Sequence, residues 1–528
     1  MISIVASRIL GLVRYRMLAA NFGSTPHLLD SFIAASAVPD AIFEVFIFGA
    51  VSVAFIPVFS SLWSHNKKEE AWNLASSMVN ISIIVFLILG GIVFFTADTL
   101  AKLVVPGLNA ASPENAHLVG NLIKLMLISQ IFFVAGTFLT SLLQSFHRFL
   151  IPAIASIFYN VGIILGIIFL VPVFGIYGPA IGMSLGAMLF MFLQIPLAYS
   201  HGFRFRLKLD FDNSVKSVVT LMVPRSLSLA AVRINDLVNV ALASLLATGS
   251  IVVFNFAQVL VLMPIALFGG SIAQASLPTL ASLFSRGKMA EFKSTFASAF
   301  NQILFFTLPS AAILSVLRIP VVRLVYGAGE FPWDLTVLTG RTLIAFTLGL
   351  VAQSLVLLFA RAFYAMHDTK TPVIIAAVAI ILDIVLSLLF VFVLHLPVVY
   401  LAVSYSAGNL VSVSLAFIAL ERKVGRFELS EIAVPFLKMI TAAFVMAISL
   451  YVPLKFLDQL VFDTTRTINL ILLTGIASVF GTFVYLALCT LFKVKEIFLV
   501  WRFFSSFGTI RKVFTKPPAV VDSESPIK

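Results

Sequence analysis

The chain has 528 residues, of which 60% are hydrophobic and only 11% are charged, and its mean hydropathy is +1.09. This composition excludes a soluble globular protein, because one core of this length cannot hide so much apolar surface from water. The formal net charge of +12 is spread over short loops between apolar segments, so it gives no support for nucleic-acid binding.

Apolar segments long enough to cross the roughly 30 Å hydrocarbon layer, about 20 residues each, follow one another along the chain. They are too long and too uninterrupted for the strands of a membrane β-barrel. We therefore predict an all-α membrane protein with about fourteen transmembrane helices. The expected spans are approximately residues 1–21, 26–61, 72–98, 119–147, 151–172, 177–200, 215–246, 249–284, 291–316, 337–366, 372–393, 397–420, 431–454 and 467–492. The second and eighth are too long for a straight crossing and should tilt or bend, with Pro39 and Pro264 as the expected places.

The two halves of the chain share an internal repeat. The pattern Gly49-x4-Ala54-x2-Pro57-x3-Ser61-Leu62-x-Ser64-x2-Lys67-x2-Glu70 returns in one register, without a gap, over residues 270–291. Duplicated bundles that enclose a site near the membrane midplane are a common transporter architecture. The repeat therefore predicts two pseudo-symmetric six-helix lobes followed by two C-terminal helices.

The expected domains follow from the repeat and the spans. They are an N-terminal six-helix lobe (1–200), a cytoplasmic linker (201–214), a C-terminal six-helix lobe (215–420), two additional transmembrane helices (421–492), and a basic amphipathic segment with a disordered cytoplasmic tail (493–528). The basic and aromatic residues of the last part suit a helix on an anionic inner leaflet, although a simple positive-inside anchor explains them almost as well.

Lysine and arginine gather in alternate loops. The even-numbered gaps between spans contain most of the basic loop residues: Lys67, Lys68, Arg148, Arg204, Arg206, Lys208, Arg286, Lys288, Lys370, Arg422, Lys423 and Arg426. By the positive-inside tendency, both termini should face the cytoplasm. Taken singly, each of these charges is also explained as a solvated loop residue.

Enzymatic chemistry has no visible basis in the sequence. Cys489 is the one cysteine, which excludes a disulfide within the chain and a thiolate metal cluster. The sequence has no HExxH motif, no Walker loop and no dinucleotide-binding glycine pattern. We expect a protein that is not an enzyme and that needs no cofactor.

Charged residues inside the first two spans are the strongest site candidates, because each costs at least ~2.5 kcal/mol at a helix centre and usually faces a cavity or a partner. The first span contains Arg8, Arg14 and Arg16, and the second begins with Asp30. On a helix Arg8 and Arg16 share a face, whereas Arg14 is displaced by about 240°. Guanidinium matches phosphate oxygens, so the cluster predicts an anionic, phosphorylated cargo. Alternatively, Arg8 and Arg16 snorkel to the cytoplasmic surface.

The seventh span, the repeat partner of the first, contains Arg225, Arg233 and Asp236. Arg233 and Asp236 are three residues apart and can pair on one helix face. Asp236 and Asp383, with Ser387 or backbone carbonyls, could form a sodium site. Alternatively, Asp236 neutralises Arg233, Asp383 accepts a hydrogen bond from a neighbouring helix, and proton coupling through either acid stays open.

Several ordered motifs resemble one known family. They are Ser7-Arg8-Ile9-Leu10-Gly11-Leu12-Val13-Arg14, Phe22-Gly23, Asp30-Ser31-Phe32, Val38-Pro39, Gly49-Ala50-x-Ser52-x2-Phe55-Ile56-Pro57, Val105-Pro106-Gly107, Arg148-Phe149-x2-Pro152-Ala153 and Ala360-Arg361-Ala362-Phe363-Tyr364-Ala365-x2-Asp368-Thr369-x-Thr371-Pro372. Together they resemble the MurJ/MviN lipid II flippases of the multidrug/oligosaccharidyl-lipid/polysaccharide exporter superfamily, over nearly the full length.

The resemblance implies two lobes around a central cavity and transport of undecaprenyl-diphosphate-linked peptidoglycan precursor from the inner to the outer leaflet of the bacterial cytoplasmic membrane. It places Arg8, Arg14 and Asp30 at positions associated with cargo recognition or gating. It also implies partners: the sugar-peptide lipid itself and cell-wall synthesis proteins, in addition to the anionic membrane lipids expected from the basic C-terminal segment.

The sequence also departs from the family pattern. Where a basic pair is usual after the proline of the second helix, this chain has Phe43 and Glu44. In the eighth helix, Val259 occupies the place where a basic residue is expected. Asp40 replaces a more usual asparagine. The cavity should therefore be less positive than is typical, which leaves two alternatives open: an exporter of another polyprenyl-linked glycan or amphiphile, or a scaffold homologue that transports nothing.

Overall fold

The computed structural model describes residues 2–48, 54–207, 209–327, 329, 331–460 and 467–498. Its helices are α1 (Ile2–Phe22), α2 (Pro26–Phe43), η1 (Glu44–Phe48), α3 (Ile56–Ser64), α4 (Lys68–Val104), α5 (Pro106–Ala111), α6 (Pro113–Ser145), α7 (Leu150–Phe174), α8 (Tyr177–Phe192), α9 (Ile195–Ser200), α10 (Asn213–Ser244), α11 (Ser250–Pro264), η3 (Ile265–Gly270), α12 (Ser271–Ser285), α13 (Met289–Val316), α14 (Arg318–Val325), α15 (Trp333–Ala365), α16 (Lys370–Leu388), η4 (Leu389–Val393), α17 (Val399–Val424), α18 (Leu429–Leu460) and α19 (Thr467–Leu491). Of the expected C-terminal segment 493–528, only residues 493–498 lie within the described ranges.

The prediction of an all-α membrane protein is confirmed for these ranges. Within them, 11 helices are long and apolar enough to cross a membrane. The count of fourteen stays a prediction, although a helix occupies each expected span. The three spans that do not qualify by length and composition are those of α1, α2 with α3, and α10, and these helices carry all of the candidate charged residues except Asp383.

The two overlong segments are interrupted near the expected prolines. Pro39 lies inside α2, and the π-helix η1 begins at Glu44. Pro264 lies inside α11, and the π-helix η3 begins directly after it. Proline removes one hydrogen bond from the helical ladder, and a π-turn is one way in which the backbone re-pairs the freed groups.

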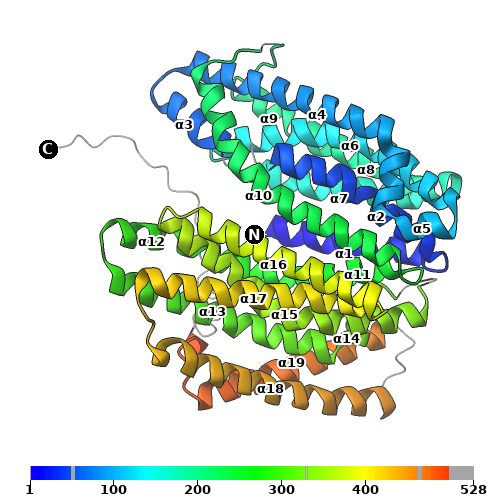
Figure 1. The fold of residues 1–528 in the computed structure, drawn as a ribbon, viewed down its shortest axis with the longest axis vertical. Coiled ribbons are helices and arrows are strands. Elements are labelled where there is room, and N and C mark those ends of the chain that lie inside the picture. The colour runs from blue at the N-terminus through cyan, green and yellow to red at the C-terminus, as the bar shows by residue number, and fades with distance from the viewer. Residues whose placement is uncertain are drawn as a thin grey trace, which may run out of the picture.

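The helices form two packed groups, with α1 of the first and α10 of the second at their boundary. The first lobe, α1 to α9, is drawn in blue and cyan in Figure 1, and the second lobe, α10 to α17, is drawn in green and yellow and lies mostly below it. Helix α10 contacts α2, η1 and α4 on one side and α11 and α16 on the other. The orange pair α18 and α19 packs against α13, on the side of the second lobe away from the first (Figure 1).

The sequence repeat forms the same turn in both lobes. Lys67 and Glu70 form an ion pair at 3.1 Å after α3, and Lys288 and Glu291 form one at 2.7 Å after α12. The residue before each lysine has a positive φ, 60° at Asn66 and 69° at Gly287. Equivalent sequence therefore gives equivalent backbone geometry at one end of each lobe, which we call the basic-loop end.

The lobes meet at the opposite end, which we call the closed end; it carries the turns after α1, α4, α10 and α14. There the backbone N–H of Gly107 donates to the Ser244 hydroxyl at 3.1 Å. Gly107 approaches so closely that a Cβ atom would overlap the Ser244 carbonyl. Gly23 also lies too close to the backbone of Phe331 for a Cβ atom to fit. Glycine at these positions lets the two lobes touch backbone to backbone.

Candidate functional site

Two adjoining cavities of about 80 and 170 Å³ lie between the lobes. They share five lining residues, namely Tyr15, Ile33, Ser36, Asp40 and Asn255, so they form one polar interior compartment with two parts. The walls come from α1, α2, α7 and α8 of the first lobe and from α10 and α11. A compartment built from both lobes changes shape when the lobes move, which is what a transport site requires.

Arg14 lines the smaller part of this compartment. Helix α1 is held against α7 by Asn160, which donates to the Ser7 hydroxyl at 3.3 Å, and this packing sets the direction of Arg14. The guanidinium lies over the Tyr15 ring at 4.7 Å and interacts with Asp40 and with the Tyr159 hydroxyl. Arg14 is therefore a partly buried cation at the boundary between the lobes.

The other predicted arginines have different surroundings. Arg16 donates to the backbone carbonyl of Leu324 on α14, so it links the lobes at the closed end and does not line the compartment. Arg8 is exposed on α1, further from the closed end than Arg14. The side chain of Arg225 lies outside the described residues. The sequence correctly separated Arg14 from its two neighbours by helix rotation, but it could not indicate which face is inward.

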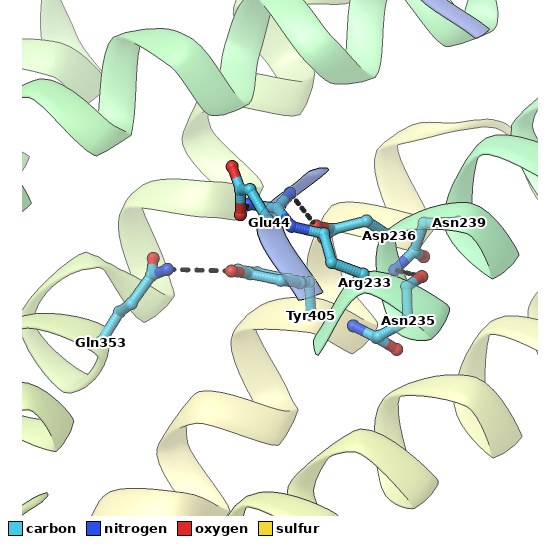
Figure 2. A network of polar contacts seen from close by, with 7 residues as sticks. All are labelled: Glu44, Arg233, Asn235, Asp236, Asn239, Gln353 and Tyr405. Carbon is cyan, nitrogen blue, oxygen red and sulfur yellow. Dashed lines mark hydrogen bonds and ion pairs between the residues drawn. The ribbon is translucent and has the colours of Figure 1, made fainter. Parts of the chain in front are cut away.

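Arg233 is the centre of an ion-pair triad in the larger part of the compartment. Its Nη1 donates to Asp236 Oδ2 at 2.8 Å, and its Nη2 donates to Glu44 (Figure 2). The pairing of Arg233 with Asp236 agrees with the alternative inferred from their spacing. Glu44 comes from the other lobe, at the junction of α2 and η1, and all three side chains stay about one-third exposed.

Asp40 adds a third carboxylate. Its Oδ1 accepts a hydrogen bond from Gln130 Nε2 on α6 at 2.8 Å. The charged side chains that line or border the compartment in the described ranges are thus two arginines and three acids: Arg14, Arg233, Asp40, Asp236 and Glu44. The expectation of a less positive cavity therefore agrees with the structure.

Asp30 lies at the closed end, away from this compartment. It is buried on α2 and accepts the backbone N–H groups of Gly249 at 2.6 Å and Val252 at 2.9 Å. These are N–H groups at the start of α11, which have no partner within their own helix. A carboxylate at a helix N-terminus also complements the helix dipole. Asp30 is therefore an inter-lobe helix cap.

An aromatic layer packs α1 of the first lobe against α11 and the turn after α14. Tyr15 on α1 contacts Phe256 on α11 edge to face, with ring centroids 5.7 Å apart. Phe256 stacks on Tyr326 at 4.0 Å, and the Tyr326 hydroxyl donates to the Phe256 carbonyl at 3.0 Å. The rings therefore hold the two lobes together with the Tyr326 hydroxyl paired.

Asp383 is the centre of a separate, buried polar cluster in the second lobe. Its Oδ2 accepts from Asn235 Nδ2 at 2.9 Å and from Asn239 Nδ2 at 3.3 Å, and its Oδ1 accepts from the Ser387 hydroxyl at 3.3 Å. The hydroxyl oxygens of Ser387 and Ser404 are 2.5 Å apart. Asp236, which we considered together with Asp383, binds Arg233 instead.

The donor set of this cluster suits a small monovalent cation. The amide oxygens of Asn235 and Asn239 are buried without a hydrogen-bond partner. The two ends of an amide are assigned from the surrounding hydrogen bonds, and turning both amides would direct their oxygens at Asp383. With Ser387 and Ser404 nearby, that arrangement provides the several oxygen ligands that a hard cation needs. Clusters of three or more His, Cys, Asp or Glu that could hold a metal do not occur in the described ranges.

Sequence reasoning missed the partners that tertiary structure supplies. Gln130, Asn235 and Asn239 gave no signal, because buried amides inside apolar spans are weak sequence features. Tyr405 and Gln353, which hydrogen-bond at 2.8 Å beside the triad, were missed for the same reason (Figure 2). Glu44 was noticed as a departure from a motif, but its partner lies on another lobe.

The fold and this site define a class: a multi-pass helical membrane transporter with a polar compartment between two lobes. Within that class, the sequence model of the family "Lipid II flippase MurJ" matches residues 18–486. The chain belongs to that family, and the resemblance noted in the sequence is confirmed.

Individual relatives agree with the family assignment. The chain is 28% identical over 373 residues to a "Probable lipid II flippase MurJ" of Buchnera aphidicola subsp. Acyrthosiphon pisum (strain APS), covering 69% of this chain and 72% of the relative. It is also 28% identical over 388 residues to the protein of the same name from Thermotoga maritima, covering 72% and 76% of the two chains.

Solved structures show the same fold. A structure described as "Lipid II flippase MurJ, inward closed conformation" superposes with a TM-score of 0.78 at 26% identity, covering 94% of this chain and 99% of that one. An inward-facing MATE family transporter of the MOP superfamily superposes with a TM-score of 0.67 at 14% identity, covering 80% and 98%, and supports the fold alone.

Proposed function

We propose that this protein is a flippase that moves undecaprenyl-diphosphate-linked peptidoglycan precursor, lipid II, from the inner to the outer leaflet of a bacterial cytoplasmic membrane. The observation that carries the proposal is Arg14, a guanidinium in a compartment built from both lobes of a MurJ family protein. A guanidinium can form two parallel hydrogen bonds to a diphosphate, whereas the surrounding apolar helices keep the prenyl tail in lipid.

The orientation follows from the basic loops. If the basic-loop end faces the cytoplasm, both termini are cytoplasmic and the closed end faces outward. The basic-loop end then faces the leaflet in which the precursor is made. Exposed Arg8, further along α1 in that direction, is placed to attract the diphosphate before it reaches Arg14.

Alternating access then needs the closed end to open. The contacts that would break are the Asp30 cap on α11, the Arg16 bond to Leu324 and the aromatic layer at Phe256. As the lobes rock, the two ends alternate, so these same contacts need not form again at the basic-loop end. Arg16 and Asp30 are gating residues in this scheme, and Arg14 is the binding residue.

Energy coupling is assigned to the Asp383 cluster. We infer that sodium, or a proton, acts there, because the buried Asp383 carboxylate is contacted by two asparagine amides whose oxygens have no hydrogen-bond partner in the described ranges. When bound, the ion would neutralise the buried Asp383 carboxylate. Asn235 and Asp236 are neighbours on α10, so a shift of that helix at Asp383 also moves the triad at Arg233.

A second cargo class is favoured by one observation, the three carboxylates that border the compartment against two arginines. An exporter of a different polyprenyl-linked glycan, or of another amphiphile, would retain the fold and the gate but bind a less anionic head group. A scaffold without transport would need none of the charged contacts.

Complementation separates these functions. In a strain depleted of its own lipid II flippase, the wild-type gene should restore growth, and Arg14→Ala and Asp30→Ala should abolish rescue while the proteins remain in the membrane. Lys67→Ala, which removes only an exposed ion pair, is the matched control and should rescue. Failure of the wild type would favour the second cargo class or a scaffold, and rescue by both variants would contradict the proposed roles of Arg14 and Asp30.

A further inference from the structure

The Arg233 guanidinium is shared between the two lobes. One nitrogen binds Asp236 on its own helix, three residues away, and the other binds Glu44 across the lobe boundary. The first interaction keeps its geometry when the lobes move, because both residues are on α10. The second must stretch or break. Glu44 is thus the partner whose contact with Arg233 reports the relative position of the lobes.

Glu44 lies where the backbone of its helix changes. It caps the C-terminus of α2 and begins the π-helix η1, and α10 contacts both segments. A π-turn in a long helix frequently marks a functional site. The side chain that bridges the lobes is therefore attached where the regular α-helical hydrogen bonding of its helix is interrupted.

The triad is accessible to a polar ligand. Glu44, Arg233 and Asp236 are each about one-third exposed, and Arg233 and Asp236 line the larger part of the compartment. In its present state Arg233 has a carboxylate on each terminal nitrogen, so it has no pair of unoccupied terminal N–H groups with which to bind a phosphate. A diphosphate carries more negative charge than one carboxylate, and it can therefore compete for the guanidinium.

We propose that Glu44 is an internal counter-ion that occupies Arg233 until the anionic part of the cargo displaces it, and that this displacement releases one lobe from the other. The inference rests on the proposed function in one respect, that the cargo carries a phosphate or diphosphate. It gives this chain a way to bind such a cargo in spite of its acidic compartment, because the acid is removed from the guanidinium as the cargo arrives.

Two isosteric variants test the two parts of this inference. Glu44→Gln removes the inter-lobe charge, and Asp236→Asn removes the same amount of charge from the same guanidinium within one helix. Purified full-length protein in lipid nanodiscs is titrated with inorganic pyrophosphate. Both variants should bind pyrophosphate about tenfold more tightly than the wild type, because each frees one side of Arg233.

Only Glu44→Gln should change the distribution of distances between the two lobes. Spin labels on Ser64→Cys and Ser285→Cys, exposed residues at the basic-loop ends of the two lobes, give the inter-lobe distance distribution in a Cys489→Ala background. We expect a narrow distribution in the wild type and in Asp236→Asn, and a broad one in Glu44→Gln without ligand. Pyrophosphate should broaden the wild-type distribution toward that of Glu44→Gln.

The proposal is overturned if Glu44→Gln binds pyrophosphate no better than the wild type, or if its distance distribution stays as narrow as that of Asp236→Asn. Glu44→Asp keeps the charge and shortens the reach, and it should give an intermediate width if Glu44→Gln does not accumulate. Since the probe is pyrophosphate, failure of the complementation experiment would count against lipid II as cargo and leave this result standing.

Discussion

Asp30 on α2 and Gly249 at the start of α11 are 219 residues apart in sequence, and they are joined by a 2.6 Å hydrogen bond from the Gly249 N–H to the Asp30 carboxylate. This bond crosses from one lobe to the other at the closed end. Loss of a helix-capping side chain costs about 1 kcal/mol in soluble proteins. The closed state should therefore be weakened by a change at Asp30, whereas neither lobe loses a contact of its own core.

Asp30→Ala is expected to open the closed end more often. A reporter cysteine at Ser36, which lines both parts of the compartment, reacts with a membrane-impermeant thiol reagent from outside only when that end is open. We expect labelling from outside to rise about fivefold in Asp30→Ala, since a loss of about 1 kcal/mol changes an equilibrium about fivefold, and to rise less in Asp30→Asn, which keeps one acceptor. Equal labelling in the wild type and Asp30→Ala would show that the cap does not hold the gate.

Gly107→Ala should also weaken the contact between the lobes at the closed end, in this case for a steric reason. A Cβ atom at Gly107 would overlap the Ser244 carbonyl, so the loop after α4 would have to withdraw from α10. Overpacking of this kind costs about 1–3 kcal/mol. The control is Gly91→Ala in the middle of α4, where a Cβ atom meets nothing within 4 Å. Thermal unfolding in detergent should show a lower midpoint for Gly107→Ala alone, and a matching loss in Gly91→Ala would contradict this explanation.

The helices could be predicted from the sequence, but the gate could not. Hydropathy identifies a span because every residue of the segment contributes to it, and a break at Pro264 follows from one backbone N–H that is missing. The Asp30 contact with α11 depends on how two lobes meet, and a single sequence contains no signal for that. A buried acid at the start of a span indicates a partner without naming it.

The same limit applies inside the compartment. The pair Arg233 and Asp236 follows from helical spacing, and the separation of Arg14 from Arg16 follows from the 100° rotation per residue. From the sequence, Glu44 was interpreted only as the absence of a usual basic residue, because its contact with Arg233 spans 189 residues. Charges that interact within one helix are therefore predictable, and those that interact across lobes require coordinates.

Arg14 and Arg16 should separate binding from gating. Arg14→Lys keeps the charge but loses the planar fork, so pyrophosphate binding should weaken by about tenfold, the value of one lost charge-assisted contact. Arg16→Lys cannot reach Leu324 in the same geometry and should raise Ser36→Cys labelling from outside without changing pyrophosphate affinity. Weakened binding in Arg16→Lys, with normal labelling, would reverse the two assignments.

The cation proposal predicts sodium-dependent stability. A ligand that binds only the folded state stabilises it by RT ln(1 + [L]/Kd), so the unfolding midpoint should rise when sodium chloride replaces choline chloride at equal ionic strength. Asp383→Asn should abolish that rise, and Asp236→Asn should retain it, because Asp236 pairs with Arg233. A wild type that responds to pH and not to sodium would assign the cluster to proton coupling instead.

Asp368 provides a pH test outside the membrane spans, in the turn between α15 and α16. Its Oδ1 accepts the backbone N–H groups of Lys370 and Thr371 at 3.0 Å each, and its Oδ2 binds Lys423 of α17. Partial burial alone would raise the pKa of Asp368, but the hydrogen bonds from Lys423 and Thr371 outweigh it and lower the pKa to about 2. A depressed pKa means that the stabilisation is complete above about pH 4 and is lost as the pH falls toward 2.

Asp368→Asn should therefore lower the free energy of unfolding by about 1 kcal/mol at pH 7, a value typical of losing a partly exposed ion pair together with a negative charge at a helix N-terminus. The difference between wild type and variant should shrink between pH 4 and pH 2, because protonation makes the wild-type side chain resemble the amide. Denaturant unfolding in detergent across that range measures both quantities. A difference that persists unchanged at pH 2 would mean that Asp368 acts through shape alone, and that the ion pair with Lys423 contributes nothing to holding α16 against α17.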